Sequence, residues 1–274
     1  MDRSTASPLV LIPGIQGRWE WMAPTIDALG ATHQVLTFSL TDTTGESAFA
    51  GWMTAIDRLL DRAGASRAPL VGVSFGGLVA AHYAALHPDR VPALVLVSPP
   101  APGWRLDPES AGYTRRPRAA LPFFALRSIR RLTPEILATF PTWGARLRFA
   151  AAYLGRALRW PVSPTQMAAW ATEWMHTDLV ADCGRIAAPT LIITGESRLD
   201  RVVSVSSSLE YLNLIPGARH ATFAGTGHIG HIAKPREFAA VVDRFLEGAP
   251  AHIERTAPSA VVGRAVREDP LGCG

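Results

Sequence analysis

The chain has 274 residues, of which 48% are hydrophobic and 18% charged, and its formal net charge is +4. A chain this apolar can bury a sizeable core, which excludes an intrinsically disordered protein, and its sparse charges and aperiodic glycines exclude coiled-coil and collagen-like chains. No apolar run approaches the roughly 18 residues of a membrane span, and the first apolar run is too short for a signal peptide. We therefore expect a cytoplasmic protein without a membrane span, built as one α/β domain with a large insertion or as two small domains.

The predicted elements, in chain order, alternate between short apolar runs and amphipathic stretches. Strands are predicted over residues 9–12, 34–40, 70–73, 93–97, 190–194 and 219–223, and all but the last contain Val, Leu or Ile. Helices are predicted over residues 21–29, 47–63, 75–86 and 235–246. Strands without polar alternation, each followed by a helix, are typical of a parallel sheet that is covered on both faces. We therefore predict an α/β fold with a doubly wound, mostly or wholly parallel sheet.

This alternation stops at about Pro100 and resumes at Pro189, and helix signals fill the interval. Thr133-Pro134-Glu135 predicts the start of one helix, because a capping hydroxyl precedes a proline at the first helical position. Ser163-Pro164-Thr165-Gln166 is a capping box and predicts the start of another. We therefore divide the chain into an α/β core over residues 1–100 and 186–248, a helical cap over residues 101–185, and a C-terminal tail over residues 249–274 without predicted structure.

The basic charge is concentrated in the predicted cap. Residues 101–160 hold eleven arginines against three acids, Asp107, Glu109 and Glu135, so this stretch carries +8 and the rest of the chain −4. A basic block of this kind can bind nucleic acid, anionic lipid or an acidic substrate, or can be a solvated helical surface. No nucleic-acid-binding motif accompanies it, so we favour the solvated surface and expect no nucleic-acid partner.

The two cysteines, Cys183 and Cys273, are too few for a disulfide scaffold, and neither has neighbours that could complete a metal site. We interpret both as free thiols, and we expect neither a metal nor a cofactor.

A candidate nucleophile lies at the junction of the third predicted strand and its helix, in Gly72-Val73-Ser74-Phe75-Gly76. A serine on a sharp strand-to-helix turn needs strained backbone angles, and side chains two residues away on either side would collide. Gly72 and Gly76 remove those collisions. The helix N-terminus behind Ser74 also favours the negative charge that develops during acyl transfer.

A serine is a weak nucleophile, so it needs a base and a group that orients the base. His228 follows a Gly-Thr-Gly loop after the last predicted strand, where it can return to the edge of the sheet, and His231 is its rival, which we interpret as a pocket or supporting residue. The orienting acid should follow the preceding strand. Asp200 is one candidate, because the Arg-Val-Val that follows would aim its carboxylate inward, and Glu196 is the alternative.

These motifs resemble the α/β-hydrolase superfamily, in which a nucleophile elbow is followed along the chain by the acid and then the histidine. The resemblance covers about residues 8–100 and 188–247, and the predicted cap lies where that family has its helical cap. It implies that Ser74 is the nucleophile, Asp200 the orienting acid and His228 the base. The loop Pro13-Gly14-Ile15-Gln16-Gly17 resembles the family's oxyanion loop, which implies that the backbone N–H groups of Ile15 and Phe75 form the oxyanion hole.

The chain departs from the family pattern at three places. Pro13 stands where the family commonly has histidine, and Asp200 lies five residues after Gly195 where three residues are more usual. The first strand corresponds to the third strand of the family, which implies a sheet of about six strands without the usual antiparallel edge strand.

The resemblance implies a serine hydrolase that cleaves a small-molecule carboxylic ester through an acyl-enzyme, although one fold hosts many functions. The same residues would support a thioesterase, a lactonase, a carbon–carbon bond hydrolase or an acyltransferase. A non-catalytic ligand-binding protein is the alternative of another class, and it would be marked by a lost member of the triad. Serine at position 74 disfavours the aspartate-nucleophile branch of dehalogenases and epoxide hydrolases. The sequence leaves the oligomeric state open.

Aromatic residues of the cap are candidates for substrate binding, and we expect a mobile helical cap over an apolar pocket. The candidates are Phe123, Phe124, Trp143, Trp170 and Trp174. Trp170 and Trp174 are four residues apart and therefore share one face of a helix. That face would either line the pocket or pack the cap onto the core.

Overall fold

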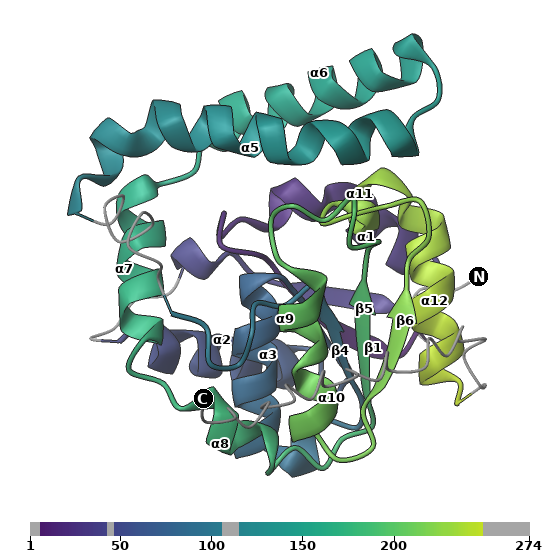
Figure 1. Cartoon of the computed structure of the whole chain (residues 1–274). Coiled ribbons are helices and arrows are strands. Elements are labelled where there is room, and N and C mark those ends of the chain that lie inside the picture. Colours follow the sequence, from purple (N-terminus) through teal and green to yellow (C-terminus); the bar gives the residue numbers. More distant parts are fainter. Residues whose placement is uncertain (1–5, 43–46, 106–114, 249–274) are drawn as a thin grey trace, which may run out of the picture.

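A six-stranded parallel sheet forms the centre of the molecule in a computed structural model, which describes residues 6–42, 47–105 and 115–248 (Figure 1). The strand order is β2-β1-β3-β4-β5-β6, and every neighbouring pair is parallel. The strands are β1 (Pro8–Ile12), β2 (Gln34–Thr37), β3 (Leu70–Val73), β4 (Leu94–Val97), β5 (Thr190–Thr194) and β6 (Arg219–Thr222). The predicted fold class, a doubly wound parallel sheet of six strands, is confirmed. The predicted tail, residues 249–274, lies outside the described residues.

The central strands are buried on both faces, as their continuous apolar sequences predict. In β1, Val10 and Ile12 join one hydrophobic cluster, whereas Leu9 and Leu11 join a second cluster on the opposite face. The other inner strands alternate in the same way, because successive side chains of a strand point to opposite faces of the sheet. The hydrophobic core is therefore two apolar layers separated by the sheet.

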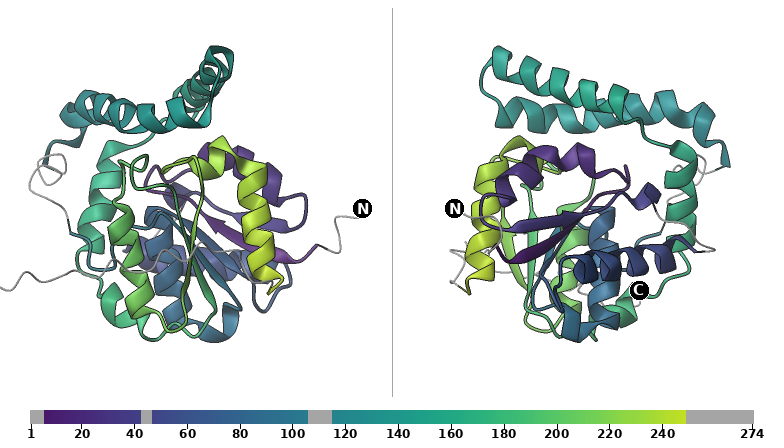
Figure 2. Two further views of the ribbon diagram at one scale, coloured as in Figure 1. Left: turned by 45° about the vertical axis from the view of Figure 1, so that its right-hand side comes forward. Right: turned by 180° about the vertical axis from the view of Figure 1, so that it is seen from behind.

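Helices cover both faces of the sheet (Figures 1 and 2). On one face lie α1 (Ala23–Leu29) and α12 (Pro235–Leu246), which the short α11 (Gly230–Ala233) contacts. On the other face lie α2 (Ala48–Arg62), α3 (Phe75–Leu86), α8 (Leu179–Cys183) and α10 (Tyr211–Leu214). The short α9 (Val205–Leu209) precedes α10, and the 3-10 turns are η2 (Trp19–Met22), η3 (Leu40–Asp42) and η4 (Pro88–Arg90). Over the three stretches given above, no helix has both the length and the apolarity to cross a membrane.

The chain between β4 and β5 is helical, as predicted, and its two longest helices lie over the end of the sheet at which the strands finish (Figures 1 and 2). It contains α5 (Pro117–Thr139), α6 (Trp143–Arg159) and α7 (Pro164–Trp174), and α5 and α6 run antiparallel as a hairpin. The predicted capping box is confirmed for its serine, because Ser163 Oγ accepts a hydrogen bond from the Gln166 N–H at 3.3 Å.

One predicted helix start in this region is wrong. Thr133 and Pro134 lie inside α5, which continues to Thr139. The Thr133 hydroxyl donates to the Ile129 carbonyl one turn earlier at 2.7 Å instead of capping a new helix. Proline removes one backbone hydrogen bond from a helix interior, a cost that burial of the neighbouring Leu132 side chain helps to offset.

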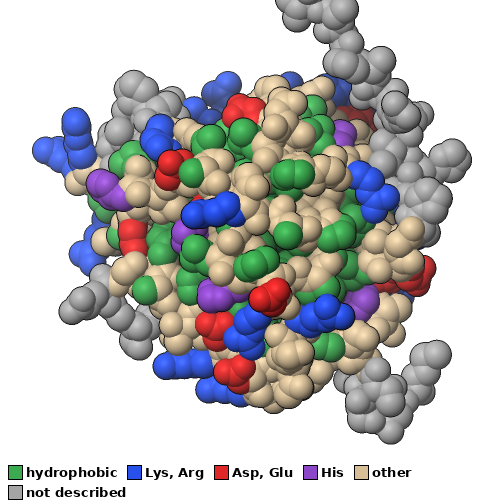
Figure 3. Space-filling model, turned by 90° about the horizontal axis from the view of Figure 1, so that it is seen from below, with side chains coloured by type: hydrophobic (Ala, Val, Ile, Leu, Met, Phe, Trp, Pro, Cys, Tyr) green, Lys and Arg blue, Asp and Glu red, His purple; other side chains and the backbone are tan. Residues whose placement is uncertain are grey.

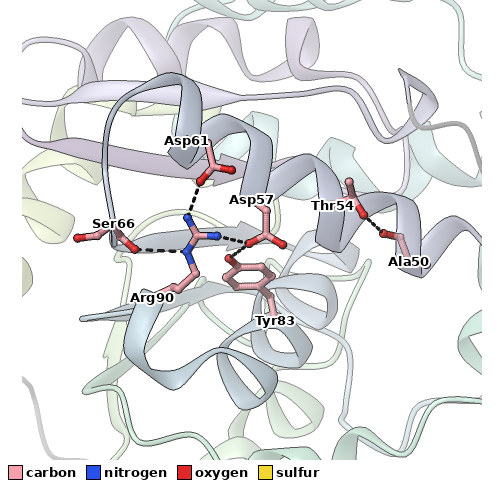
Figure 4. A network of polar contacts seen from close by, with 7 residues as sticks. All are labelled: Ala50, Thr54, Asp57, Asp61, Ser66, Tyr83 and Arg90. Carbon is pink, nitrogen blue, oxygen red and sulfur yellow. Dashed lines mark hydrogen bonds and ion pairs between the residues drawn. The ribbon is translucent and has the colours of Figure 1, made fainter.

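A polar network joins α2 to α3 and η4 away from the strand ends (Figure 4). Arg90 donates to Asp57 at 2.6 Å and to Asp61 at 2.9 Å, and the Tyr83 hydroxyl donates to the same Asp57 carboxylate at 2.6 Å. Burial, followed by the hydrogen bond to Asp57, raises the pKa of Tyr83, so the phenol stays protonated and keeps donating. The network thereby fixes the helix that carries the candidate nucleophile at its other end.

Removing the hydroxyl group of Tyr83 should lower the free energy of unfolding, whereas removing that of Tyr211 should not. Tyr83→Phe loses the hydrogen bond to Asp57 and should lower the free energy of unfolding by about 1 kcal/mol. Tyr211 is fully buried, and its hydroxyl has no hydrogen-bond partner within the described ranges. Tyr211→Phe should therefore be neutral or stabilising. Urea denaturation of both variants measures this, and equal losses of stability would contradict the assignment of the network.

Candidate active site

Ser74 lies between β3 and α3 in a backbone conformation that side chains rarely adopt. Its φ is 53° and its ψ is −120°, in the left-handed half of the conformational map. The Ser74 N–H donates to the Val97 carbonyl at 2.7 Å, and the Ser74 carbonyl accepts from the Gly77 N–H at 2.8 Å. Two backbone hydrogen bonds therefore hold a strained turn, which is the geometry that a nucleophile elbow requires.

The glycines on either side of Ser74 are required by close approaches of the backbone. A Cβ at Gly72 would overlap the Gly76 carbonyl, and a Cβ at Gly76 would overlap the Pro13 carbonyl. The two contacts explain why the sequence has glycine on both sides of Ser74. Only glycine lets β3, the start of α3 and the loop after β1 come this close.

The loop after β1 lies directly beside Ser74. The Gly17 N–H donates to the Gly14 carbonyl at 2.8 Å and closes a turn around Ile15, and Gly17 supplies the positive φ of 77° that this turn needs. A Cβ at Gly14 would lie 3.5 Å from the Ser74 Cβ, so the turn and the serine are neighbours. No hydrogen bond among the described residues uses the N–H of Ile15 or of Phe75. Both amides are therefore available to an oxyanion.

His228 and Asp200 come together at the ends of β6 and β5. His228 Nδ1 lies 3.3 Å from Asp200 Oδ2, and both side chains are buried. Asp200 Oδ1 accepts from the backbone N–H groups of Val202 and Val203 at 3.1 and 3.0 Å. The loop after Asp200 thus turns the carboxylate inward, as its sequence predicts.

The electrostatics of the pair favour an ionised acid. Burial would raise the pKa of Asp200, but the charge and hydrogen bond of His228, with hydrogen bonds from the Val203 amide and the Ser98 hydroxyl, hold this pKa below its ordinary value. Ser98 follows β4, directly after Val97, whose carbonyl receives the Ser74 N–H. The end of β4 therefore connects the serine turn to the acid.

Glu196, the alternative acid, has different partners. Its Oε1 accepts from the Gly225 N–H at 2.6 Å, and its Oε2 pairs with Arg198 at 2.7 Å. These contacts hold the start of the loop that carries His228, and the hydrogen bond from Gly225 is the largest cause that lowers the pKa of Glu196. The carboxylate that meets His228 is that of Asp200.

His231, the rival histidine, is buried against α12, with its ring edge-on to Phe238 at a centroid distance of 6.2 Å. Burial, together with the nearby His228, lowers the pKa of His231 to about 3, so it is neutral. Its carbonyl accepts from the Thr25 hydroxyl at 2.8 Å. His231 therefore supports the loop from the side of α1 and α12.

The predicted aromatic residues of the cap fall into two groups. Trp170 and Trp174 are buried in the core cluster, where Trp174 lies 6.2 Å from the Phe75 ring and Trp170 covers Gly17. Phe123 and Trp143 are 68% and 73% exposed, which is not the exposure of pocket-lining side chains in this conformation. The Phe124 side chain lies outside the described residues. The two tryptophans thus pack α7 against the residues around Ser74, and a role in substrate binding stays a prediction.

The sequence does not predict the role of Glu135, a carboxylate of α5 that reaches the histidine loop. The side chain is 1% exposed, and both of its oxygens lie 3.1 Å from the Ile229 N–H, next to His228. On the same helix, the Thr139 hydroxyl donates to the Gly225 carbonyl at 3.0 Å. Burial raises the pKa of Glu135 to about 7, against the lowering effects of the Ile229 and Gly227 amides and of His228. The sequence around Glu135 carries no signal of this contact.

Because of Glu135, the free energy of unfolding should fall as the pH rises from about 4.5 to about 7. The folded protein holds the Glu135 proton up to about pH 7, whereas the ordinary value is 4.5. The folded state therefore binds more protons between these values, and the stability that they supply is lost as pH rises toward 7 and above. Glu135→Gln keeps the shape without the titration, so the variant should gain about 2–3 kcal/mol relative to the wild type between pH 5 and pH 8.

Glu196→Gln is the matched control for this measurement. The pKa of Glu196 is lowered, so its contribution is already complete above its ordinary pKa and is lost only in acid. The difference in unfolding free energy between wild type and Glu196→Gln should stay constant from pH 5.5 to pH 8. A constant difference for Glu135→Gln over the same interval would show that the buried carboxyl does not titrate there.

Comparison with known proteins agrees with this geometry. A family model described as the alpha/beta hydrolase fold matches residues 7–235. The chain belongs to the α/β-hydrolase family. This α/β-hydrolase is 31% identical over 213 residues to a 2-hydroxymuconate semialdehyde hydrolase of Pseudomonas putida, and the match covers 76% of this chain and 72% of the relative. It is 28% identical over 257 residues to a putative carbamate hydrolase RutD of Caulobacter sp. (strain K31), covering 90% and 92%.

Solved α/β-hydrolase structures share the fold. The enol-lactonase from Burkholderia xenovorans LB400 aligns with a TM-score of 0.69 at 22% identity, covering 90% of this chain and 94% of that one. A thermophilic esterase from Thermogutta terrifontis aligns with a TM-score of 0.68 at 20% identity, covering 89% and 90%. The structural likeness shows that the fold is shared. At these low sequence identities, the substrate of this α/β-hydrolase has to be argued from its own site.

Proposed function

We propose that this α/β-hydrolase is a serine hydrolase that cleaves carboxylic esters of small molecules through an acyl-enzyme. The observation that carries the proposal is the elbow at Ser74, with its φ of 53°, at the same edge of the sheet as the His228–Asp200 pair at 3.3 Å. A strained serine turn has a cost of order 1–3 kcal/mol, and it is typical of sites where that strain serves a reaction.

The proposed reaction has two halves. His228 Nε2 takes the proton from Ser74 Oγ as this oxygen attacks the acyl carbon, and Asp200 stabilises the resulting imidazolium through Nδ1. The N–H groups of Ile15 and Phe75 donate to the oxyanion of the tetrahedral intermediate. The intermediate collapses, His228 gives its proton to the departing alkoxide, and the alcohol leaves. Water then attacks the acyl-enzyme with the same proton transfers and releases the acid.

A second candidate is hydrolysis of a carbon–carbon bond beside a carbonyl group. The likeness to the 2-hydroxymuconate semialdehyde hydrolase, at 31% identity over most of both chains, favours it. Both reactions use a serine hydroxyl, a base and an oxyanion hole, so they differ in the leaving group. An oxygen leaving group needs a proton on an alkoxide, whereas a carbon leaving group needs a proton on a carbanion or enolate.

Initial rates distinguish these reactions. The panel consists of p-nitrophenyl esters of increasing acyl length, a thioester, a lactone and a vinylogous 1,5-diketone, which is cleaved at a carbon–carbon bond. Ester hydrolysis predicts the highest kcat/KM on one of the esters, and preference for the diketone would transfer the proposal to the second candidate. A fluorophosphonate probe should label Ser74 in either case. Absence of labelling and of turnover would indicate a non-catalytic ligand-binding protein.

A further inference from the structure

Large apolar side chains are exposed mainly on α5 and α6. Among the described residues, twelve large hydrophobic side chains are exposed, and eight of them lie on these two helices. They are Phe123, Leu126, Ile129, Leu137, Trp143, Leu147, Leu154 and Leu158. Scattered exposed apolar residues are ordinary, but a concentration of them on one element is typical of an interaction surface. We call residues 115–159 the α5–α6 hairpin.

On α6 the exposed apolar side chains form a stripe. Trp143, Leu147, Leu154 and Leu158 are 58–75% exposed, and at 100° per residue they fall within an arc of about 60°. Another side of α6 packs inward, where the Tyr153 ring meets Trp21 edge-on at 4.9 Å. The inward packing leaves the apolar stripe of α6 outside the core.

The charge of the hairpin has a single sign at its surface. Residues 115–159 hold ten arginines and one acid, Glu135 of α5, whose side chain is buried. Arg148 and Arg159 are exposed on α6 and lie about 80–100° around the helix from the nearest edge of the apolar stripe, and Arg118 and Arg130 are exposed on α5. By contrast, basic and acidic side chains are interspersed on the face seen from below in Figure 3, on the other side of the molecule.

Apolar side chains beside exposed arginines limit which partner fits the hairpin. A second copy of the same face would bring twenty arginines together with no exposed acid, which disfavours self-association. A nucleic acid would use the arginines but would leave the apolar stripe in water. A lipid surface with anionic headgroups satisfies both features, because leucine and tryptophan enter the boundary between headgroups and acyl chains while arginines bind phosphates.

We propose that the α5–α6 hairpin docks the protein on an anionic lipid surface, with the stripe of Trp143, Leu147, Leu154 and Leu158 toward the acyl chains. The hairpin lies over the edge of the sheet where the strands end (Figures 1 and 2). Docking therefore turns the edge that carries Ser74 and His228 toward the lipid.

Co-sedimentation with vesicles tests the docking. The full chain should bind vesicles of phosphatidylcholine with 30% phosphatidylglycerol at least about tenfold more tightly than vesicles of phosphatidylcholine alone. Raising the salt from 50 to 500 mM should weaken this binding by a further tenfold or more, because the arginine contacts are screened. Equal binding to the two kinds of vesicle, or no binding to either, would overturn the proposal.

Two double variants separate the charged contribution from the apolar one. Arg148→Gln with Arg159→Gln should weaken binding by about 30-fold, since each arginine near an anionic surface contributes about 1 kcal/mol. Leu147→Ser with Leu158→Ser should weaken it by about tenfold or more by removing apolar burial. Both should keep the wild-type thermal unfolding temperature, as expected for exposed positions.

The matched controls carry the same changes elsewhere. Arg58→Gln with Arg62→Gln changes two exposed arginines on α2, and Leu86→Ser with Val180→Ser changes exposed apolar side chains outside the hairpin. Both controls should bind vesicles as the wild type does. Equal losses in the controls would overturn the proposal, as would concentration-dependent dimers in sedimentation velocity without vesicle binding, which would assign the surface to a second copy.

Discussion

Replacing Ser74 by alanine should abolish turnover while leaving the fold intact. In a serine, histidine and acid unit, loss of the nucleophile costs about 10⁶ in kcat, because no other group can form the acyl-enzyme. The turn should survive, because its hydrogen bonds use the N–H and carbonyl of residue 74 and the close approaches around it involve Gly72 and Gly76. Alanine meets the same steric cost as serine at a φ of 53°.

The measurement compares steady-state rates on the best ester of the panel with the thermal unfolding temperature of each protein. Ser206→Ala, at an exposed position on α9, is the matched control and should leave both quantities unchanged. The fluorophosphonate probe should label the control and the wild type but not Ser74→Ala. Retention of a tenth of the wild-type rate by Ser74→Ala would refute the proposed mechanism.

The next largest effect is expected at Asp200. Asp200→Asn keeps an oxygen that can accept from the Val202 and Val203 amides, so the loop should keep its shape. Its amide nitrogen, however, would face His228 Nδ1 as a second donor, which favours the wrong tautomer of the imidazole and removes the charge that stabilises the imidazolium. A loss of this kind is on the order of 10⁴ in kcat.

Glu196→Gln is the comparison that makes this prediction specific. Glu196 holds the Gly225 amide and pairs with Arg198, so the change should loosen the histidine loop and lower kcat by roughly tenfold or less. The ranking of the two variants is read from kcat at pH 8 on one substrate. If Glu196→Gln were the more damaging change, the orienting role would pass to Glu196.

The parts of the site that the sequence predicts are those determined by local geometry. The turn at Ser74 follows from a strand that runs directly into a glycine-flanked serine, since the close approach of Gly72 to Gly76 lies within five residues. The loop beyond Asp200 is equally local, because its carboxylate accepts from amides two and three residues later. The parallel sheet follows from continuous apolar strands alternating with helices.

The parts that the sequence does not predict depend on contacts between distant segments. Glu135 and Ile229 are 94 positions apart, and no pattern near either residue indicates their hydrogen bond. The second strand ends at Thr37 although its apolar run continues to Leu40, because Leu40 lies in η3 and is buried there, with its carbonyl accepting from Trp52. A short apolar run does not distinguish a strand from a buried turn.

The contact between Glu135 and the Ile229 amide links α5 to the loop that carries His228. Glu135 lies on α5 and Ile229 adjoins His228, so a displacement of α5 would deprive the histidine loop of its buried acceptor. A ligand that holds α5 in place would thereby also order His228, the proposed base. By thermodynamic reciprocity, an ordered histidine loop would favour the observed position of α5 by the same free energy. The position of α5 and the order of the histidine loop would then be one cooperative equilibrium rather than two independent ones.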